Sequence, residues 1–116
     1  MAVDERLSTE EVTPELVSYV VEKIVRAIKP VKIVVFGSHA RGDSAPDSDL
    51  DLLVIEDGGE PSRAVRRRIE DLLWGRRFGL DLVVRKPEQV ERNLRARNRF
   101  YAHEVFKHGK VLYERR

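Results

Sequence analysis

The apolar positions of this chain follow a helical spacing in its first part and form short unbroken runs afterwards. Between residues 13 and 30 they recur every three or four residues, which predicts an amphipathic helix that packs on the core. Thr13 supplies a capping hydroxyl and Pro14 suits the first helical position, while Pro30 ends the pattern. Residues 1–12 are polar and aperiodic, and we expect them to form a flexible N-terminal arm.

Three apolar runs rich in β-branched residues predict the main strands of one sheet, at 31–36, 50–55 and 80–85. The remaining elements that the pattern predicts are helix 62–77, helix 87–97, helix 98–108 and a short final strand at 110–114. The connection between the first two strands is too short for a crossover helix, so we expect a mixed sheet. The prediction is an α/β (α+β) fold in which residues 13–116 form a single domain, with a small mixed sheet flanked by helices.

Candidate chemistry lies where the first predicted strand ends and the second begins. Gly37 allows a sharp turn and a close approach of a ligand to the backbone, and Ser38 can cap the short helical turn that follows. After ten intervening residues, Asp49 and Asp51 alternate along the strand, so both side chains project from one face with Cα atoms roughly 6.5–7 Å apart. Two carboxylates this close stay ionised only beside a cation, and all-oxygen ligands suit Mg²⁺.

Each half of this pattern alone has a simpler interpretation, as a turn and as a solvated strand end. The two together, at consecutive strand ends and in this order, favour a site for a phosphate and a metal. Asp81 stands near the start of the third predicted strand, where an acid is costly unless it is solvated or bound. Asp81 is therefore the candidate for a third carboxylate of the same site.

Other polar residues carry weaker signals. Arg41 lies in the turn after Ser38 and is a candidate for binding a phosphate oxygen, although a solvated loop arginine is nearly as good an interpretation. His103 and His108 are five residues apart, a spacing that does not align them on one face of an α-helix, so we do not expect them to bind metal. Trp74 is expected to pack in the core.

Composition separates the chain into an acidic and a basic half. The net charge is +2, with 36% charged residues. Residues 1–62 hold 6 Lys and Arg against 13 Asp and Glu, a net −7, whereas residues 63–116 hold 16 against 7, a net +9. This asymmetry suits a polyanionic ligand or an acidic partner, although most of the arginines are expected to lie on solvated helix faces.

Cysteine is absent, which excludes disulfides and thiolate chemistry. Neither a signal peptide nor a membrane span is apparent, so we expect a cytoplasmic protein.

The stretch from Gly37 to Val54, GSHARGDSAPDSDLDLLV, resembles the signature of the nucleotidyltransferase superfamily that includes DNA polymerase beta. It is most similar to the minimal nucleotidyltransferases, or MNT-domain proteins, which are often antitoxins paired with HEPN-domain toxins. The resemblance runs from about residue 31 to the C-terminus. It implies a polymerase-beta-like nucleotidyltransferase core with two Mg²⁺ ions. Under it, Asp49, Asp51 and Asp81 are the metal-binding and catalytic residues, and Gly37 and Ser38 bind the triphosphate.

The resemblance further implies that AMP is moved from ATP to a tyrosine hydroxyl of a HEPN ribonuclease toxin, in a hetero-oligomer with that toxin. Only about thirty residues follow the third strand's helix region, so we expect the acceptor to dock from outside. Two alternatives stay open. In the first, the protein is a non-catalytic antitoxin that neutralises its toxin by stoichiometric binding. In the second, it is an RNA nucleotidyltransferase. An aromatic stacking platform is missing from the arginine-rich helix 62–77, which disfavours direct binding of nucleic acid.

Overall fold

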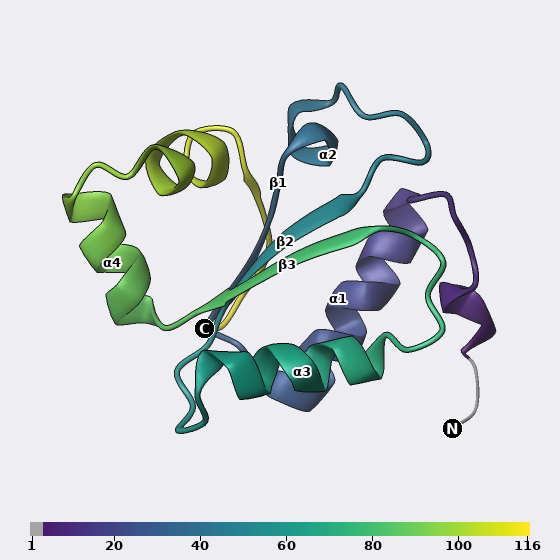
Figure 1. Ribbon diagram of the computed structural model, residues 1–116, viewed down its shortest axis with the longest axis horizontal. Coiled ribbons are helices and arrows are strands. Elements are labelled where there is room, and N and C mark those ends of the chain that lie inside the picture. Colours follow the sequence, from purple (N-terminus) through teal and green to yellow (C-terminus); the bar gives the residue numbers. More distant parts are fainter. Residues whose placement is uncertain (1–3) are drawn as a thin grey trace.

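Four strands form one mixed sheet in the computed structural model of the protein, which describes residues 4–116 (Figure 1). The strands are β1 (Lys32–Phe36), β2 (Leu50–Ile55), β3 (Leu80–Arg85) and β4 (Lys110–Glu114), in the spatial order β3-β2-β1-β4. β1 runs antiparallel to both of its neighbours, and β2 runs parallel to β3. The predicted mixed sheet flanked by helices is confirmed.

The helices cover the two faces of this sheet. They are η1, a 3₁₀-helix (Glu5–Leu7), then α1 (Pro14–Ile28), α2 (Ser38–Arg41), α3 (Ser62–Leu72), α4 (Pro87–Arg95) and η2, a π-helix (Phe100–Val105). The N-terminus of α1 follows the sequence prediction, because the Thr13 hydroxyl accepts a hydrogen bond from the Leu16 N–H at 3.1 Å. Within residues 4–116, none of the helices combines the length and apolarity needed to span a bilayer.

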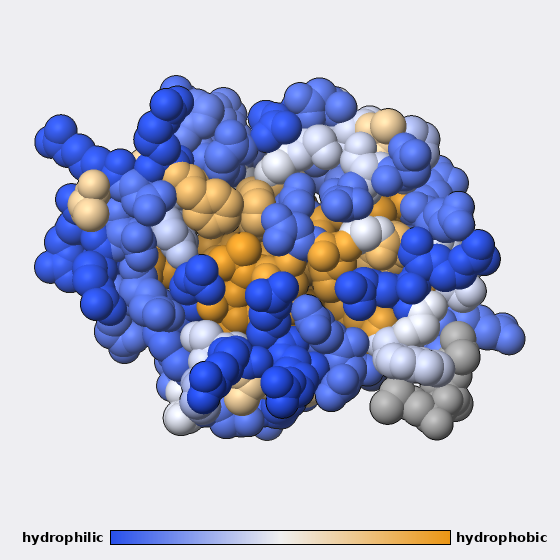
Figure 2. All heavy atoms as spheres, viewed as in Figure 1, coloured by the Kyte–Doolittle hydropathy of each residue, from blue (hydrophilic) through white to orange (hydrophobic). Residues whose placement is uncertain are grey.

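An apolar layer lies on each face of the sheet. On one face, α1 and α3 pack with one side of every strand, around side chains such as Ile24, Ile69 and Leu82. On the other face, α4 and η2 bury Val90 and Tyr101 against the opposite side of β1 and β2. Figure 2 shows polar atoms around the margins of the molecule and an apolar band across its middle, at the level of β3. Strand β3 thus forms an edge of the sheet that the helices leave uncovered in this view.

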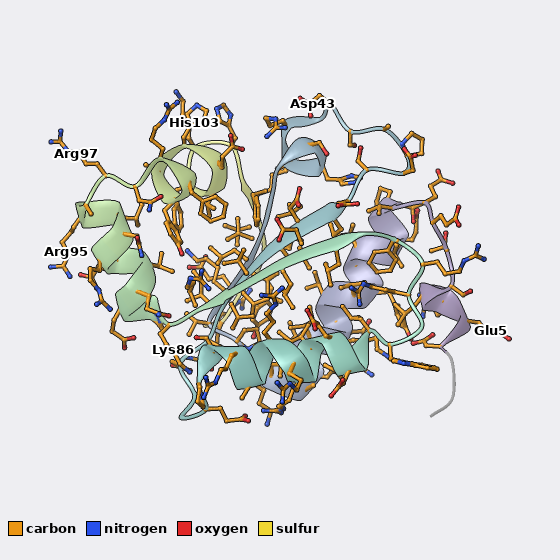
Figure 3. The ribbon with its side chains drawn as sticks, viewed as in Figure 1. Glu5, Asp43, Lys86, Arg95, Arg97 and His103 are labelled. Atoms are coloured by element: carbon orange, nitrogen blue, oxygen red, sulfur yellow. The ribbon has the colours of Figure 1, made fainter. Side chains whose placement is uncertain are left out.

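The buried carboxylate Glu56 orders the loop that follows β2. Its side chain pairs with Lys86, the residue before α4, and also accepts the Gly58 N–H at 3.0 Å. Lys86 lies below α4, next to the start of α3, and donates to the Gly58 carbonyl at 2.8 Å (Figure 3). This loop is therefore held by a buried ion pair with its remaining hydrogen bonds satisfied, as a buried charge requires.

The expectation of a flexible arm over residues 1–12 is corrected for the part that the structure describes. Residues 4–12 lie against the body of the protein, and Leu7 of η1 is 0% exposed, within the layer formed by α1 and α3. Asp4 accepts hydrogen bonds from the Tyr19 hydroxyl and from Lys23, the latter at 2.9 Å. Residues 1–3 lie outside the described residues. A single buried leucine in a polar segment has no periodicity, which is why the pattern missed it.

Two predicted helices differ from the observed ones. Helix α3 ends at Leu72, five residues before the predicted end, and Trp74 lies beyond it with 49% of its surface exposed, so the expectation that it packs in the core was wrong. The predicted helix 98–108 is a π-helix at its centre. In a π-helix residues five apart share a face. The rings of His103 and His108 accordingly lie 4.6 Å apart, which contradicts the argument from α-helical spacing.

The docked N-terminal segment gives a prediction about stability. Leu7→Ala is expected to lower the free energy of unfolding by about 2–5 kcal/mol, because it leaves a cavity in a closed apolar layer. Chemical denaturation measures this change, with Ser8→Ala as the control because Ser8 is an exposed neighbour. A loss for Leu7→Ala no larger than that of the control would show that the segment is loosely held, as the sequence suggested.

Candidate active site

The strand directions bring the predicted site residues to one end of the sheet. β1 ends where antiparallel β2 begins, and parallel β3 begins at the same end. In the register of the sheet, Phe36 lies opposite Asp51, and Asp51 lies opposite Asp81. Residues directly opposite each other in neighbouring strands project from the same face. Asp51 and Asp81 therefore stand side by side, on the face that α4 and η2 cover.

Gly37 joins β1 to α2 and lies against the Asp51 carboxylate. It has φ +72° and ψ −153°, a conformation that favours glycine. A Cβ atom on Gly37 would lie 2.1 Å from Oδ2 of Asp51, closer than any two such atoms can approach. Gly37 also takes the N-cap position of α2, so the expectation that the Ser38 hydroxyl caps this turn was wrong. Ser38 is the first residue of the helix.

Gly79 makes the corresponding room for Asp49, a role that the sequence did not reveal. The Gly79 carbonyl accepts the Leu50 N–H at 2.9 Å, which sets the loop before β3 beside the start of β2. A Cβ atom on Gly79 would lie 1.9 Å from Oδ1 of Asp49. Each of the two glycines thus forms what we call a carboxylate seat, a position where the missing Cβ atom leaves room for one carboxylate. The position of Gly79 directly before a strand with an early acid was the available signal.

Electrostatics shows that the three carboxylates act on one another. Burial and then the nearby charges of Asp81 and Asp49 raise the pKa of Asp51 from its ordinary value of 3.8 to about 6. His39 and Arg41 lower the same pKa, by a smaller amount. Asp49 and Asp81 are exposed to solvent, and Asp51 is partly buried between them. The site is therefore a concentration of negative charge that favours either a proton or a cation.

His39 and Arg41 fix the shape of the loop between α2 and β2. The Nε2 atom of His39 lies 2.9 Å from the Ser48 carbonyl, one residue before Asp49. Arg41 pairs with Asp43 at 3.3 Å and with Glu104 of η2 at 2.9 Å. The loop that carries Asp43 and the π-helix that carries His103 accordingly lie near each other at one end of the molecule (Figure 3). A phosphate that binds Arg41 has to compete with these two carboxylates.

The donor atoms at this edge fit a hard divalent cation. Asp49, Asp51 and Asp81 supply only carboxylate oxygens, and none of them forms an ion pair within residues 4–116. In that same part of the chain, no three acidic, His or Cys side chains are already arranged as a complete ligand set. Mg²⁺ commonly takes one or two protein carboxylates and completes its octahedron with substrate phosphates and water. The residues present are consistent with such an open site.

A family model and a curated relative match this chain. The family model described as "Nucleotidyltransferase domain" matches residues 17–111. A stretch of 64 residues is 34% identical to a bifunctional uridylyltransferase/uridylyl-removing enzyme from Streptomyces coelicolor, and it covers 53% of this chain but only 8% of that enzyme.

Three solved structures share the fold at lower sequence identity. One, from Sulfolobus solfataricus, is described as a candidate nucleotidyltransferase and superimposes with a TM-score of 0.59 at 23% identity, covering 87% of this chain and 79% of that one. The second is a toxin–antitoxin with AMP-PNP, with a TM-score of 0.54 at 21% identity. The third is a mutant of the toxin–antitoxin MntA–HpeT, with a TM-score of 0.52 at 19% identity. For each of these two, the match covers 85% of this chain and 74% of the other. At these identities the likeness establishes the fold alone.

The two carboxylate seats give a prediction that separates activity from stability. Gly79→Ala and Gly37→Ala are each expected to displace a carboxylate and to lower nucleotidyl transfer at least tenfold, because a flexible side chain moves more easily than the backbone. Gly42→Ala is the matched control, since Gly42 has φ +84° and a Cβ atom placed on it would meet nothing within 4 Å. Transfer assays and thermal unfolding measure the two effects. Equal losses of activity in Gly37→Ala and Gly42→Ala would show that backbone strain, and not the seat, matters.

The raised pKa of Asp51 gives a prediction about pH. In EDTA, the folded protein binds a proton at Asp51 up to about pH 6, whereas the unfolded chain releases it near its ordinary value of 3.8. Protonated Asp51 therefore stabilises the fold at low pH, and this contribution is lost as the pH rises through about 6. The melting temperature of the wild type minus that of Asp51→Asn is expected to fall over this range. A difference that stays constant from about pH 4 to 7 would contradict the shift.

Proposed function

Because the chain belongs to the nucleotidyltransferase domain family, we propose that it transfers a nucleoside monophosphate from ATP to a hydroxyl of a partner protein. We propose further that it is the cytoplasmic antitoxin of a HEPN-type ribonuclease toxin, which it silences by adding AMP to a tyrosine. The family model matches most of the chain and supports the reaction class. The likeness of the fold to two toxin–antitoxin proteins, one of them solved with AMP-PNP, supports the partner and the nucleotide.

The observation that carries the proposal is the pairing of Asp51 with Asp81 in the sheet, beside the turn at Gly37. Phosphoryl-type transfer depends on positioning and charge neutralisation more than on covalent help from the protein. A set of mutually repelling carboxylates next to the turn at Gly37 suits those two needs. A structural role alone would not keep three unpaired acids at one sheet end, because each raises the electrostatic cost of its neighbours.

Each residue has a separate role in the proposed reaction. Asp49, Asp51 and Asp81 would hold the metal, and Gly37 and Ser38 would position the triphosphate through the backbone and the Ser38 hydroxyl. A Mg²⁺ ion held by these carboxylates would supply neutralisation of the phosphate charge. Gly37 keeps the turn close to Asp51, so that the phosphates and the carboxylates share one small volume.

The proposed transfer needs only ATP, the acceptor hydroxyl and a carboxylate that takes up the proton. The acceptor oxygen attacks the α-phosphorus of ATP, a new oxygen–phosphorus bond forms, and the bond from the α-phosphorus to the bridging oxygen breaks to release pyrophosphate. The acceptor's proton passes to a carboxylate oxygen of Asp81. Asp81 suits this role because it is exposed and lies on the outermost strand of the sheet, where an external acceptor can approach it.

The decisive experiment mixes the protein with the HEPN-type product of a neighbouring reading frame, Mg²⁺ and ATP, and takes the intact masses of both proteins. We expect AMP additions on the partner that disappear with Asp49→Asn, Asp51→Asn or Asp81→Asn. Thermal unfolding of these variants is expected to match or exceed that of the wild type, because the substitutions relieve repulsion. Asp47→Asn is the control, since Asp47 is an exposed acid of the same loop.

Two outcomes would contradict the proposal. Full neutralisation of the toxin by Asp49→Asn, with no change of mass on either protein, would establish an antitoxin that acts by occlusion. Transfer of label from α-labelled ATP onto RNA, with the partner protein unmodified, would establish an RNA nucleotidyltransferase.

A further inference from the structure

Strand β3 offers an unpaired edge that begins beside the proposed catalytic acids. It pairs with β2 on one side only, as the end of the order β3-β2-β1-β4. The bonds at its two ends fix which backbone groups are used, since Gly79 accepts the Leu50 N–H at 2.9 Å and Arg85 accepts the Glu56 N–H at 3.1 Å. Because groups alternate along a strand, Asp81 and Val83 also bond to β2.

The alternate residues of β3 direct their backbone groups away from the sheet. The N–H and C=O groups of Leu80 and Leu82 point outward, and no backbone partner for them is present among residues 4–116. At the far end, the Arg85 guanidinium donates to the Val84 carbonyl at 2.8 Å and partly closes the edge there. The open part of the edge is therefore the part that flanks Asp81.

The surroundings of this edge are apolar and accessible. Figure 2 shows the apolar band at the level of β3, and Figure 1 shows that neither α3 nor α4 crosses in front of the strand. Val83 is partly buried, and Leu80 is likewise only partly covered. An exposed edge with free backbone groups and apolar side chains is a ready template for another strand.

We propose that an extended segment of the partner protein adds to β3 as a fifth strand and thereby places its acceptor hydroxyl beside Asp81. This inference rests on the proposed function and names how the acceptor is recognised. Alternating backbone donors and acceptors at strand spacing match a polypeptide and not a nucleic acid, whose backbone has no N–H groups. In such strand addition the main chain supplies affinity and the alternate side chains supply specificity.

Arg85 adds a requirement on the sequence of that segment. It projects from the same face as Asp81, four residues along the strand, or roughly 13 Å away. Its guanidinium has no carboxylate partner within the described residues and is bound only to a carbonyl. An acidic side chain opposite Arg85 would complement it. The preferred acceptor is thus an extended segment with its hydroxyl residue and an acidic residue four positions apart.

Nuclear magnetic resonance with synthetic peptides tests the strand addition directly. The probe is the peptide Lys-Thr-Tyr-Val-Val-Thr-Asp-Thr-Lys for a parallel fifth strand, and the peptide of reversed sequence for an antiparallel one. At about 1 mM peptide, one of them is expected to slow hydrogen exchange at the amides of Leu80 and Leu82 at least tenfold. The amides of Asp81 and Val83 serve as internal controls, because they are already bonded to β2. A peptide with N-methylated backbone amides should have no effect.

Charge exchange tests the role of Arg85. Arg85→Glu should weaken binding of the Asp-containing peptide at least fivefold, and replacing the peptide's Asp with Lys should restore it. Arg67→Glu is the matched control, because Arg67 is an exposed arginine of α3 and has no ion pair within the described residues. Equal weakening by both substitutions would overturn the assignment of Arg85. Exchange at Leu80 and Leu82 that neither peptide slows would overturn the strand addition.

Intact masses separate this inference from the proposed function. Slower exchange at the amides of β3, with no AMP on the tyrosine of the peptide or on the partner, would refute the transfer reaction and support the strand addition. AMP transfer to the partner without slower exchange at the Leu80 and Leu82 amides would support the reaction and refute the strand addition. Binding of single-stranded RNA in place of peptide at these amides would show that the edge serves another class of partner.

Discussion

The repulsion among three carboxylates at one end of the sheet is the constraint on which the rest of the site depends. Asp51 stands between Phe36 of β1 and Asp81 of β3 in the sheet register, so it cannot move away without breaking the pairing of three strands. Burial first, and then the charges of Asp81 and Asp49, raise the pKa of Asp51 to about 6, so it is unfavourable for all three acids to be ionised together. The strands hold these charges in place because apolar layers on both faces of the sheet fix the strands.

Close approach of the backbone makes the arrangement possible. Gly37 and Gly79 each leave room for one carboxylate, and they lie directly after β1 and directly before β3. Only Gly37 also needs an unusual backbone angle, at φ +72°. The two glycines therefore serve the site for different physical reasons. The substitution Gly79→Ala would bring its methyl group against the Asp49 carboxylate, but it would not force alanine into a left-handed backbone conformation.

Much of this could be predicted from the sequence because it depends on local pattern. Periodicity and strand direction predict strands β1, β2 and β3, helix α1 with its Thr13 cap, and the convergence of Gly37 with the acids. The features that sequence missed depend on distant contacts or on rare geometry. Burial of Leu7 requires a surface built by α1 and α3, and the seat at Gly79 requires a partner that is distant in the sequence. The π-helix η2 changes which residues share a face, so the conclusion that His103 and His108 lie on different faces was wrong.

One topology explains both the acidic site and the open edge. A parallel β2–β3 pair places Asp81 in register with Asp51 and at the same time leaves β3 outermost, because no later strand joins that side in the described chain. β4 instead pairs with β1, on the far side of the sheet from Asp81. Natural sheets protect such edges with charges or by covering them. Here the protection is partial, with Arg85 bonded to the Val84 carbonyl at one end and the acids at the other. Unprotected backbone between two charged ends is the arrangement on which the proposed addition of a partner strand depends.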